Sequence, residues 1–120
     1  MRRDPRAYLW DVGEASRLIA EFVDGIGFED FSANTLVRSA VERQFEIIGE
    51  ALSQLAKVDP ALAARVPEHR SIIAFRNVLI HGYAVLDHEL VWRAIRGDLP
   101  ALRVAVDSLL ADLGPSPETR

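Results

Sequence analysis

Cysteine is missing from the sequence, so neither a disulfide framework nor a thiolate metal site is possible. Long apolar runs are missing too. No stretch approaches the length of a membrane span, and no apolar segment of a secretory signal follows the basic residues near the N-terminus. We therefore expect a cytoplasmic protein that does not associate with a membrane.

An excess of positive charge is also lacking. The chain has 14 lysines and arginines against 18 acidic residues, for a net charge of -4 at pH 7. Proteins that hold nucleic acid by bulk electrostatics usually present a basic surface. Any contact with RNA must therefore come from a few arginines that converge at one site. Apart from Lys57 every basic residue is arginine, which grips phosphate through two parallel hydrogen bonds.

Strand signals, internal repeats and low-complexity tracts are essentially absent, whereas apolar residues recur at helical spacing. We predict helices over residues 5–24, from a cap at Ser32 to Lys57, over residues 61–65, from Pro67 to His81, and from a cap at Asp87 to Leu113. Residues 28–31 are predicted as a turn of helix or a loop. The last helix should kink at residues 97–100, because Pro100 lacks an N–H, and Asp98 should cap its continuation.

The expected fold class is all-α. Short connections make neighbouring helices antiparallel, which favours an up-down four-helix bundle with short extra helices. Residues 1–113 would form a single helical domain, and residues 114–120 a flexible C-terminal tail. The helices ending at Lys57 and His81 carry more apolar surface than one core needs, which indicates a homodimer. Gly49 costs the first of these helices about 1 kcal/mol relative to alanine, and close approach of another helix would compensate.

The residues 76–83, Arg-Asn-Val-Leu-Ile-His-Gly-Tyr, combine an apolar helix with polar groups. Arg76 falls in the row of Ile73 and Ile80, where an unpaired charge would be costly. We therefore expect its guanidinium to be paired by a partner subunit and, transiently, by a phosphate.

The end of this helix places a histidine one turn beyond an amide. Asn77 and His81 share a face, and Gly82 is typical of the residue that ends a helix. The carbonyl end of the helix favours a protonated imidazole. A histidine able to exchange protons near neutral pH, close to an amide and an arginine, indicates phosphodiester cleavage. The alternative is a histidine that caps the helix beside a structural arginine.

Three glutamates, Glu42, Glu46 and Glu50, are spaced by four along the predicted second helix. They form either a solvated acidic face or an arrangement in which Glu46 or Glu50 orients Arg76 across the bundle. The sequence has no Glu-x-x-His pair, so a di-metal carboxylate site is not expected. We expect neither a metal nor a cofactor.

The motif Arg76-Asn77-x-x-x-His81 resembles the catalytic motif of the HEPN superfamily, and its extension to Tyr83 resembles HepT-like toxins in particular. Three further stretches agree: residues 46–51, residues 72–75 and residues 98–100. The similarity runs from about Tyr8 to Leu110. One departure is the segment Glu68-His69-Arg70, where family members often carry a tryptophan. It concerns local substrate contacts and not the fold.

This resemblance implies a dimeric helical ribonuclease toxin that works without a metal and cleaves RNA, with tRNA as a candidate. Its partner would be an MntA-like minimal nucleotidyltransferase antitoxin. In that family the tyrosine matching Tyr83 accepts AMP, which silences the toxin. Arg76, Asn77 and His81 match the catalytic positions by identity.

In this interpretation His81 acts as general base or acid, Arg76 stabilises the phosphorane, and Asn77 fixes the imidazole tautomer. Arg76 and His81 project roughly 140° apart on one helix. A two-fold pairing of these helices would place His81 of one chain by Arg76 of the other. AMP on Tyr83, which shares a face with Arg76, would block the entry of phosphate.

Two other hypotheses remain open from the sequence. In the first, the chain is a non-catalytic helical dimer that serves as a binding or substrate module for a nucleotidyltransferase. In the second, it is a nucleotide-sensing adaptor in which Arg76 binds a triphosphate.

Overall fold

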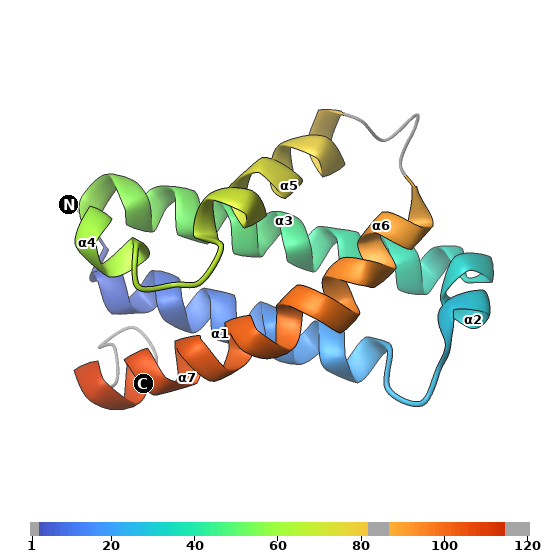
Figure 1. The fold of residues 1–120 in the computed structure, drawn as a ribbon, viewed down its shortest axis with the longest axis horizontal. Helices are drawn as coiled ribbons and strands as arrows, with labels where there is room; N and C mark the ends of the chain where they lie inside the picture. The colour runs from blue at the N-terminus through green and yellow to red at the C-terminus, as the bar shows by residue number, and fades with distance from the viewer. Residues whose placement is uncertain (1–2, 82–86, 115–120) are drawn as a thin grey trace.

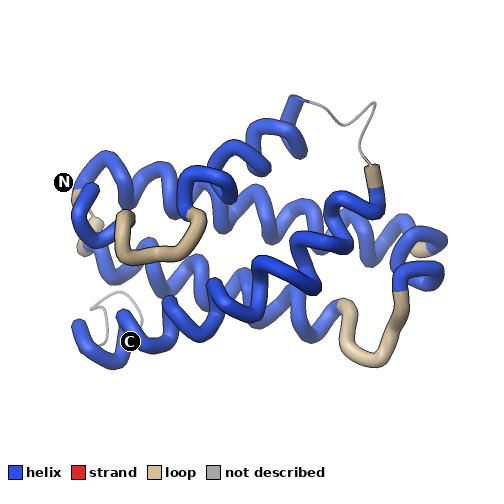
Figure 2. Tube along the Cα trace, viewed as in Figure 1, coloured by secondary structure: helices blue, strands red, loops and turns tan. Residues whose placement is uncertain are grey.

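The structure, a computed structural model, describes residues 3–81 and 87–114, and every regular element within them is helical (Figures 1 and 2). The elements are α1 (Pro5–Phe22), α2 (Phe28–Ala33), α3 (Thr35–Val58), α4 (Pro60–Ala63), α5 (His69–His81), α6 (His88–Arg93), η2 (Ala94–Asp98) and α7 (Leu99–Leu113). The prediction of an all-α protein is confirmed. The four-helix bundle and the homodimer stay predictions. No helix in the described ranges has both the length and the hydropathy needed to cross a membrane.

Two helices, α1 and α4, begin at Asp-Pro pairs. Asp4 Oδ1 accepts a hydrogen bond from the Arg6 backbone N–H at 2.9 Å, at the start of α1. Asp59 Oδ1 accepts from the Leu62 backbone N–H at 3.1 Å, at the start of α4. In both helices the following proline takes the first position, where a missing N–H costs nothing. These local signals act without help from the rest of the fold.

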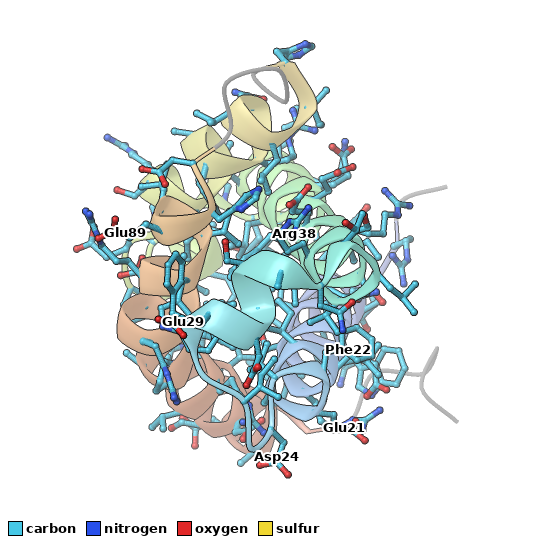
Figure 3. All side chains as sticks on the ribbon, turned by 90° about the vertical axis from the view of Figure 1, so that its right-hand side faces the viewer. Glu21, Phe22, Asp24, Glu29, Arg38 and Glu89 are labelled. Atoms are coloured by element: carbon cyan, nitrogen blue, oxygen red, sulfur yellow. The ribbon has the colours of Figure 1, made fainter. Side chains whose placement is uncertain are left out.

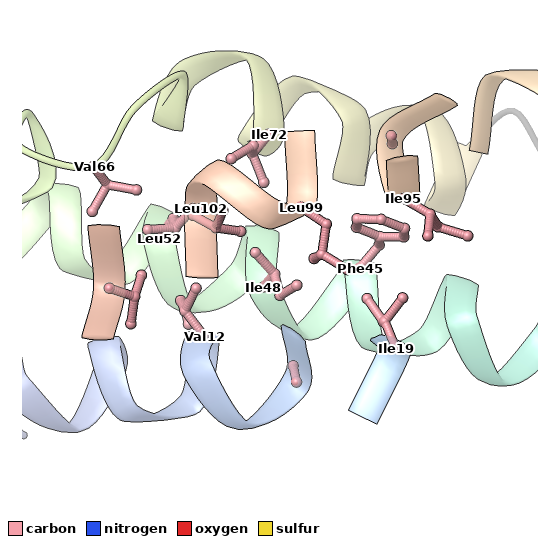
Figure 4. Packing of buried hydrophobic residues seen from close by; sticks show 14 of the residues in the cluster. Val12, Ile19, Phe45, Ile48, Leu52, Val66, Ile72, Ile95, Leu99 and Leu102 are labelled. Atoms are coloured by element: carbon pink, nitrogen blue, oxygen red, sulfur yellow. The ribbon is translucent and has the colours of Figure 1, made fainter. Parts of the chain in front are cut away.

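The core lies between α1, α3, α5 and α7, where α3 packs against α1 and α5, and α7 packs against α1 (Figures 1 and 4). One apolar stripe of α3 is buried along most of its length. Its buried members are Val41, Phe45, Ile48, Leu52 and Leu55. Each side chain of this kind stabilises the fold by about 1.5–3 kcal/mol when fully buried. This packing makes α3 the platform on which α5 rests.

The segment before α3 differs from the prediction, because Ser32 does not cap that helix. Ser32 belongs to α2, a helix of its own, and its Oγ lies 3.2 Å from His88 Nδ1. The cap is Asn34, whose Oδ1 accepts from the Val37 backbone N–H at 3.1 Å. The ring of Phe31, 5.2 Å from that of Trp92, holds α2 against α6. Tertiary contacts therefore end α2 before α3 begins.

The start of α5 also lies later than predicted, at His69 instead of Pro67. Glu68 adopts φ 58°, in the left-handed region that non-glycine residues rarely enter. Its carbonyl oxygen accepts from the Ile72 backbone N–H at 3.0 Å. The chain therefore turns sharply at Glu68 before the helix can begin.

The predicted kink near Pro100 is a π-helical turn. The segment η2 joins α6 to α7 without a break, as Figure 1 shows. Asp98 has helical dihedral angles and its side chain makes no capping hydrogen bond, so the prediction that it caps a new helix was wrong. A proline ring crowds the carbonyl four residues earlier, and a π turn, with one extra residue, relieves such crowding.

Candidate active site

Arg76 lies on the face of α5 that rests on α3, and its side chain is only 23% exposed. Its Nη1 forms an ion pair with Glu50 Oε2 on α3. Its Nη2 donates to Asn77 Oδ1 at 2.9 Å. The charge of Arg76 is therefore paired within the same chain. Its partner, Glu50, is one of the two carboxylates predicted from the sequence as candidates.

The third nitrogen of this guanidinium has no such partner. Arg76 Nε is buried and has no hydrogen-bond partner among the described residues. An unmatched buried donor is unfavourable, because it gives up its hydrogen bond to water. The arginine is thus held at one end of its guanidinium and unsatisfied at the other.

Close contact between the two helices depends on Gly49. A Cβ built on Gly49 would lie 2.4 Å from Arg76 Cβ, a separation that real Cβ atoms essentially never show. The close approach predicted for this glycine is confirmed, and the residue that approaches is Arg76. Gly49 therefore sets how near the arginine comes to α3.

The two candidate carboxylates have different partners. Glu50 Oε1 accepts from Gln54 Nε2 at 3.1 Å, so both of its oxygens are bound. Glu46, one turn earlier, pairs with Arg43 at 3.5 Å. Sequence reasoning missed Gln54, although its i, i+4 spacing from Glu50 was a signal for it. Of the two candidates, Glu50 is therefore the one that contacts Arg76.

Glu42 continues the same acidic row into a different environment. Burial raises the pKa of Glu42, and the positive charges of Arg38 and His88 oppose that rise. Arg38 Nη1 donates to the carbonyl oxygen of Ser32, which ties α3 to α2. Figure 3 looks onto this end of the molecule, where Arg38 lies close to α2. Glu42 thus belongs to the junction of α2, α3 and α6.

His81 is the last residue of α5 and is exposed, as is Asn77. No hydrogen bond joins His81 to Asn77 or to Arg76 within the described part of the chain. The predicted contact that would fix the imidazole tautomer is therefore not made here, and the Asn77 amide oxygen instead holds Arg76. The predicted acceptor Tyr83 lies outside the described residues. One chain brings Arg76, Asn77 and Glu50 together and leaves His81 apart.

Two exposed apolar side chains lie near these polar groups on α5. Val78 is 43% exposed and Ile80 38% exposed, and they project from nearly opposite sides of the helix. A groove of about 490 Å³ lies between α5 and the continuous helix of α6, η2 and α7, and the rings of Phe45 and Phe75 contribute to its lining. Within residues 3–81 and 87–114, no group of three or more His, Cys, Asp or Glu side chains is placed to hold a metal ion.

Known proteins match this chain over most of its length. A family model described as "Ribonuclease HepT-like" matches residues 12–109. A Thermococcus cleftensis protein named "Probable ribonuclease HepT" is 36% identical over 109 residues, which cover 91% of this chain and 98% of that protein. A Methanocaldococcus jannaschii protein named "Putative RNase MJ1380" is 33% identical over 106 residues, covering 88% and 96% respectively. No solved structure gives a significant match.

The chain therefore belongs to the ribonuclease HepT-like family, and the family resemblance read from the motif is confirmed.

Proposed function

We propose that this protein is an endoribonuclease toxin that cleaves RNA without a metal, using Arg76, Asn77 and His81 at a cleft shared by two copies of the chain. The observation that carries the proposal is the arrangement on α5. A guanidinium on this helix is held by Glu50 and Asn77, and an exposed histidine ends the same helix. Relatives with ribonuclease names across nearly the whole chain support it.

A second copy is needed because of where the side chains point. Arg76 and His81 project roughly 140° apart on one helix, too far to aim at one phosphate. Ile80, which is exposed, projects about 40° from Arg76 on the same helix and would be covered if two α5 helices paired there. In such a pair, His81 of one chain would approach Arg76 of the other.

The proposed reaction forms a bond between the ribose 2′-oxygen and phosphorus and breaks the bond from phosphorus to the 5′-oxygen. One His81 takes the proton of the 2′-hydroxyl, and the second copy gives a proton to the leaving oxygen. Arg76 stabilises the charge that develops on the phosphorane. The products are a 2′,3′-cyclic phosphate and a 5′-hydroxyl. Asn77 serves by fixing Arg76, as its hydrogen bond indicates.

We propose that the activity of the toxin is switched off by modification of Tyr83, two residues after His81. A minimal nucleotidyltransferase antitoxin would transfer AMP from ATP to the Tyr83 hydroxyl, with release of pyrophosphate. Tyr83 is seven residues from Arg76 and shares its helical face if the helix continues. The added phosphate would then compete with RNA for the guanidinium.

A cleavage assay with bulk tRNA tests the reaction. We expect the wild type to cut and both Arg76→Ala and His81→Ala to lose cleavage while they stay folded by circular dichroism. His69→Ala is the matched control, since it removes a histidine from the other end of α5 and should still cut. If the wild type and all variants behave alike, the non-catalytic binding module becomes the better interpretation.

A further inference from the structure

Glu50 forms an ion pair with Arg76, the cation that the proposed reaction needs for binding phosphate. We infer that this carboxylate is an internal competitor of the substrate: it holds Arg76 in the free protein and must leave before a phosphodiester can bind. The inference rests on the proposed function, because it concerns the regulation of the same arginine. It adds a step in which Arg76 is released from Glu50 before RNA binds and is cleaved.

The three nitrogens of Arg76 show why release is required. Nη1 is bound to Glu50, Nη2 to Asn77, and Nε is buried without a partner. A phosphate is gripped most strongly by two neighbouring N–H groups at once. While Glu50 is in place, Nη1 and Nη2 each have one N–H group engaged and the Nε–H is buried, so the two-point grip that uses Nε is closed to phosphate. Once the carboxylate withdraws, the side chain is able to turn and present Nε together with an Nη group.

Glu50 is also placed to withdraw. Its side chain is 53% exposed, and ion pairs at such surfaces are weak. It lines a hollow of about 260 Å³ between α1 and α3, to which Arg43 and Gln54 also contribute. Gln54 already donates to one oxygen of the carboxylate at 3.1 Å, whereas Arg43 in the same hollow is paired with Glu46. Glu50 therefore has an alternative position on its own helix.

The chain supplies a matched control for this idea. Glu46 lies one turn earlier on α3, lines the same hollow and pairs with Arg43 instead of Arg76. Glu46→Gln and Glu50→Gln each remove one negative charge and keep the size of the side chain. Only the second change frees Arg76, so the difference between the two variants isolates the competition.

The test measures binding to a short RNA oligonucleotide with 2′-O-methyl groups, which cannot be cleaved through the 2′-hydroxyl. Fluorescence anisotropy gives Kd for the full chain and its variants. We expect Glu50→Gln to tighten Kd about two- to fivefold relative to Glu46→Gln, the range set by an ion pair of this exposure. Glu50→Ala should act in the same direction. In an Arg76→Ala background the two Gln variants should bind equally.

Three results would overturn the inference: equal or weaker binding by Glu50→Gln, a gain that persists without Arg76, or no Arg76-dependent binding by any variant. The cleavage assay distinguishes failure of the competitor role of Glu50 from failure of the proposed ribonuclease function. If Glu50→Gln tightens binding through Arg76 but the wild type cuts no RNA, the competitor role stands and the reaction fails. If RNA is cut while Kd is unchanged by Glu50→Gln, the reaction stands and the competitor role fails.

Discussion

Gly49 and Arg76 are in direct contact across the α3–α5 interface, and a Cβ on Gly49 would also lie 2.9 Å from Arg76 Cγ. The aliphatic part of the Arg76 side chain fills the space that a side chain at position 49 would occupy. The position of the guanidinium beside Glu50 therefore depends on the absence of one methyl group on α3.

The first prediction concerns this glycine. Gly49→Ala should destabilise the protein by about 1–3 kcal/mol, because overpacking outweighs the usual gain from alanine in a helix. Gly13→Ala is the control: its Cβ would lie 3.4 Å from Val106 Cγ1, an ordinary contact. That variant should be stabilised by up to about 1 kcal/mol. Urea unfolding measures both, and a stabilised Gly49→Ala would contradict the geometry.

The second prediction separates charge from shape at position 76. Arg76→Lys keeps a cation for Glu50 but loses the fork of N–H groups that reaches Asn77 and a phosphate. RNA cleavage should fall by about 10²-fold or more, as when one preorganised donor is removed from an active site. The initial rate of tRNA cleavage measures the effect, with thermal unfolding to check the fold. Full activity in the lysine variant would show that charge alone is enough.

The third prediction is a pH dependence that originates at Glu42. Burial raises the pKa of Glu42 above the usual 4.5, so the folded state binds this proton more tightly than the unfolded chain does. The contribution of Glu42 to stability therefore declines as pH rises from that value through the raised one. Glu42→Gln cannot ionise, so its stability relative to the wild type should increase with pH across this window.

Urea unfolding of both proteins between about pH 4 and pH 7 measures this difference, and the other carboxylates cancel in the subtraction. A difference that stays flat or falls over the window would show that Arg38 and His88 compensate the cost of burial.

The fourth prediction concerns the acceptor of AMP. The chain has two tyrosines, Tyr8 and Tyr83. After incubation with ATP and the partner nucleotidyltransferase, intact mass should increase for the wild type and for Tyr8→Phe, and stay unchanged for Tyr83→Phe. RNA cleavage should decrease in step with the modification, because the added anion competes at Arg76. Modification of Tyr83→Phe would assign the acceptor to another residue.

Some features of this fold could be predicted because their signals are local. The Asp-Pro starts at Asp4 and Asp59 and the apolar stripe of α3 need no knowledge of distant residues. The cap of α3 was harder, since Ser32 and Asn34 are both suitable caps. Contacts of Ser32 with His88, far away in sequence, left the role to Asn34.

By itself, the sequence determined the all-α class, the positions of the long helices and the family motif at residues 76–83, because periodicity and spacing are properties of neighbouring residues. The tertiary structure alone decided which glutamate meets Arg76. Glu46 and Glu50 are equivalent along their own helix, one turn apart. Only the crossing of α5 over α3 at Gly49 brings the guanidinium to Glu50, and that crossing is set by packing between segments distant in the chain.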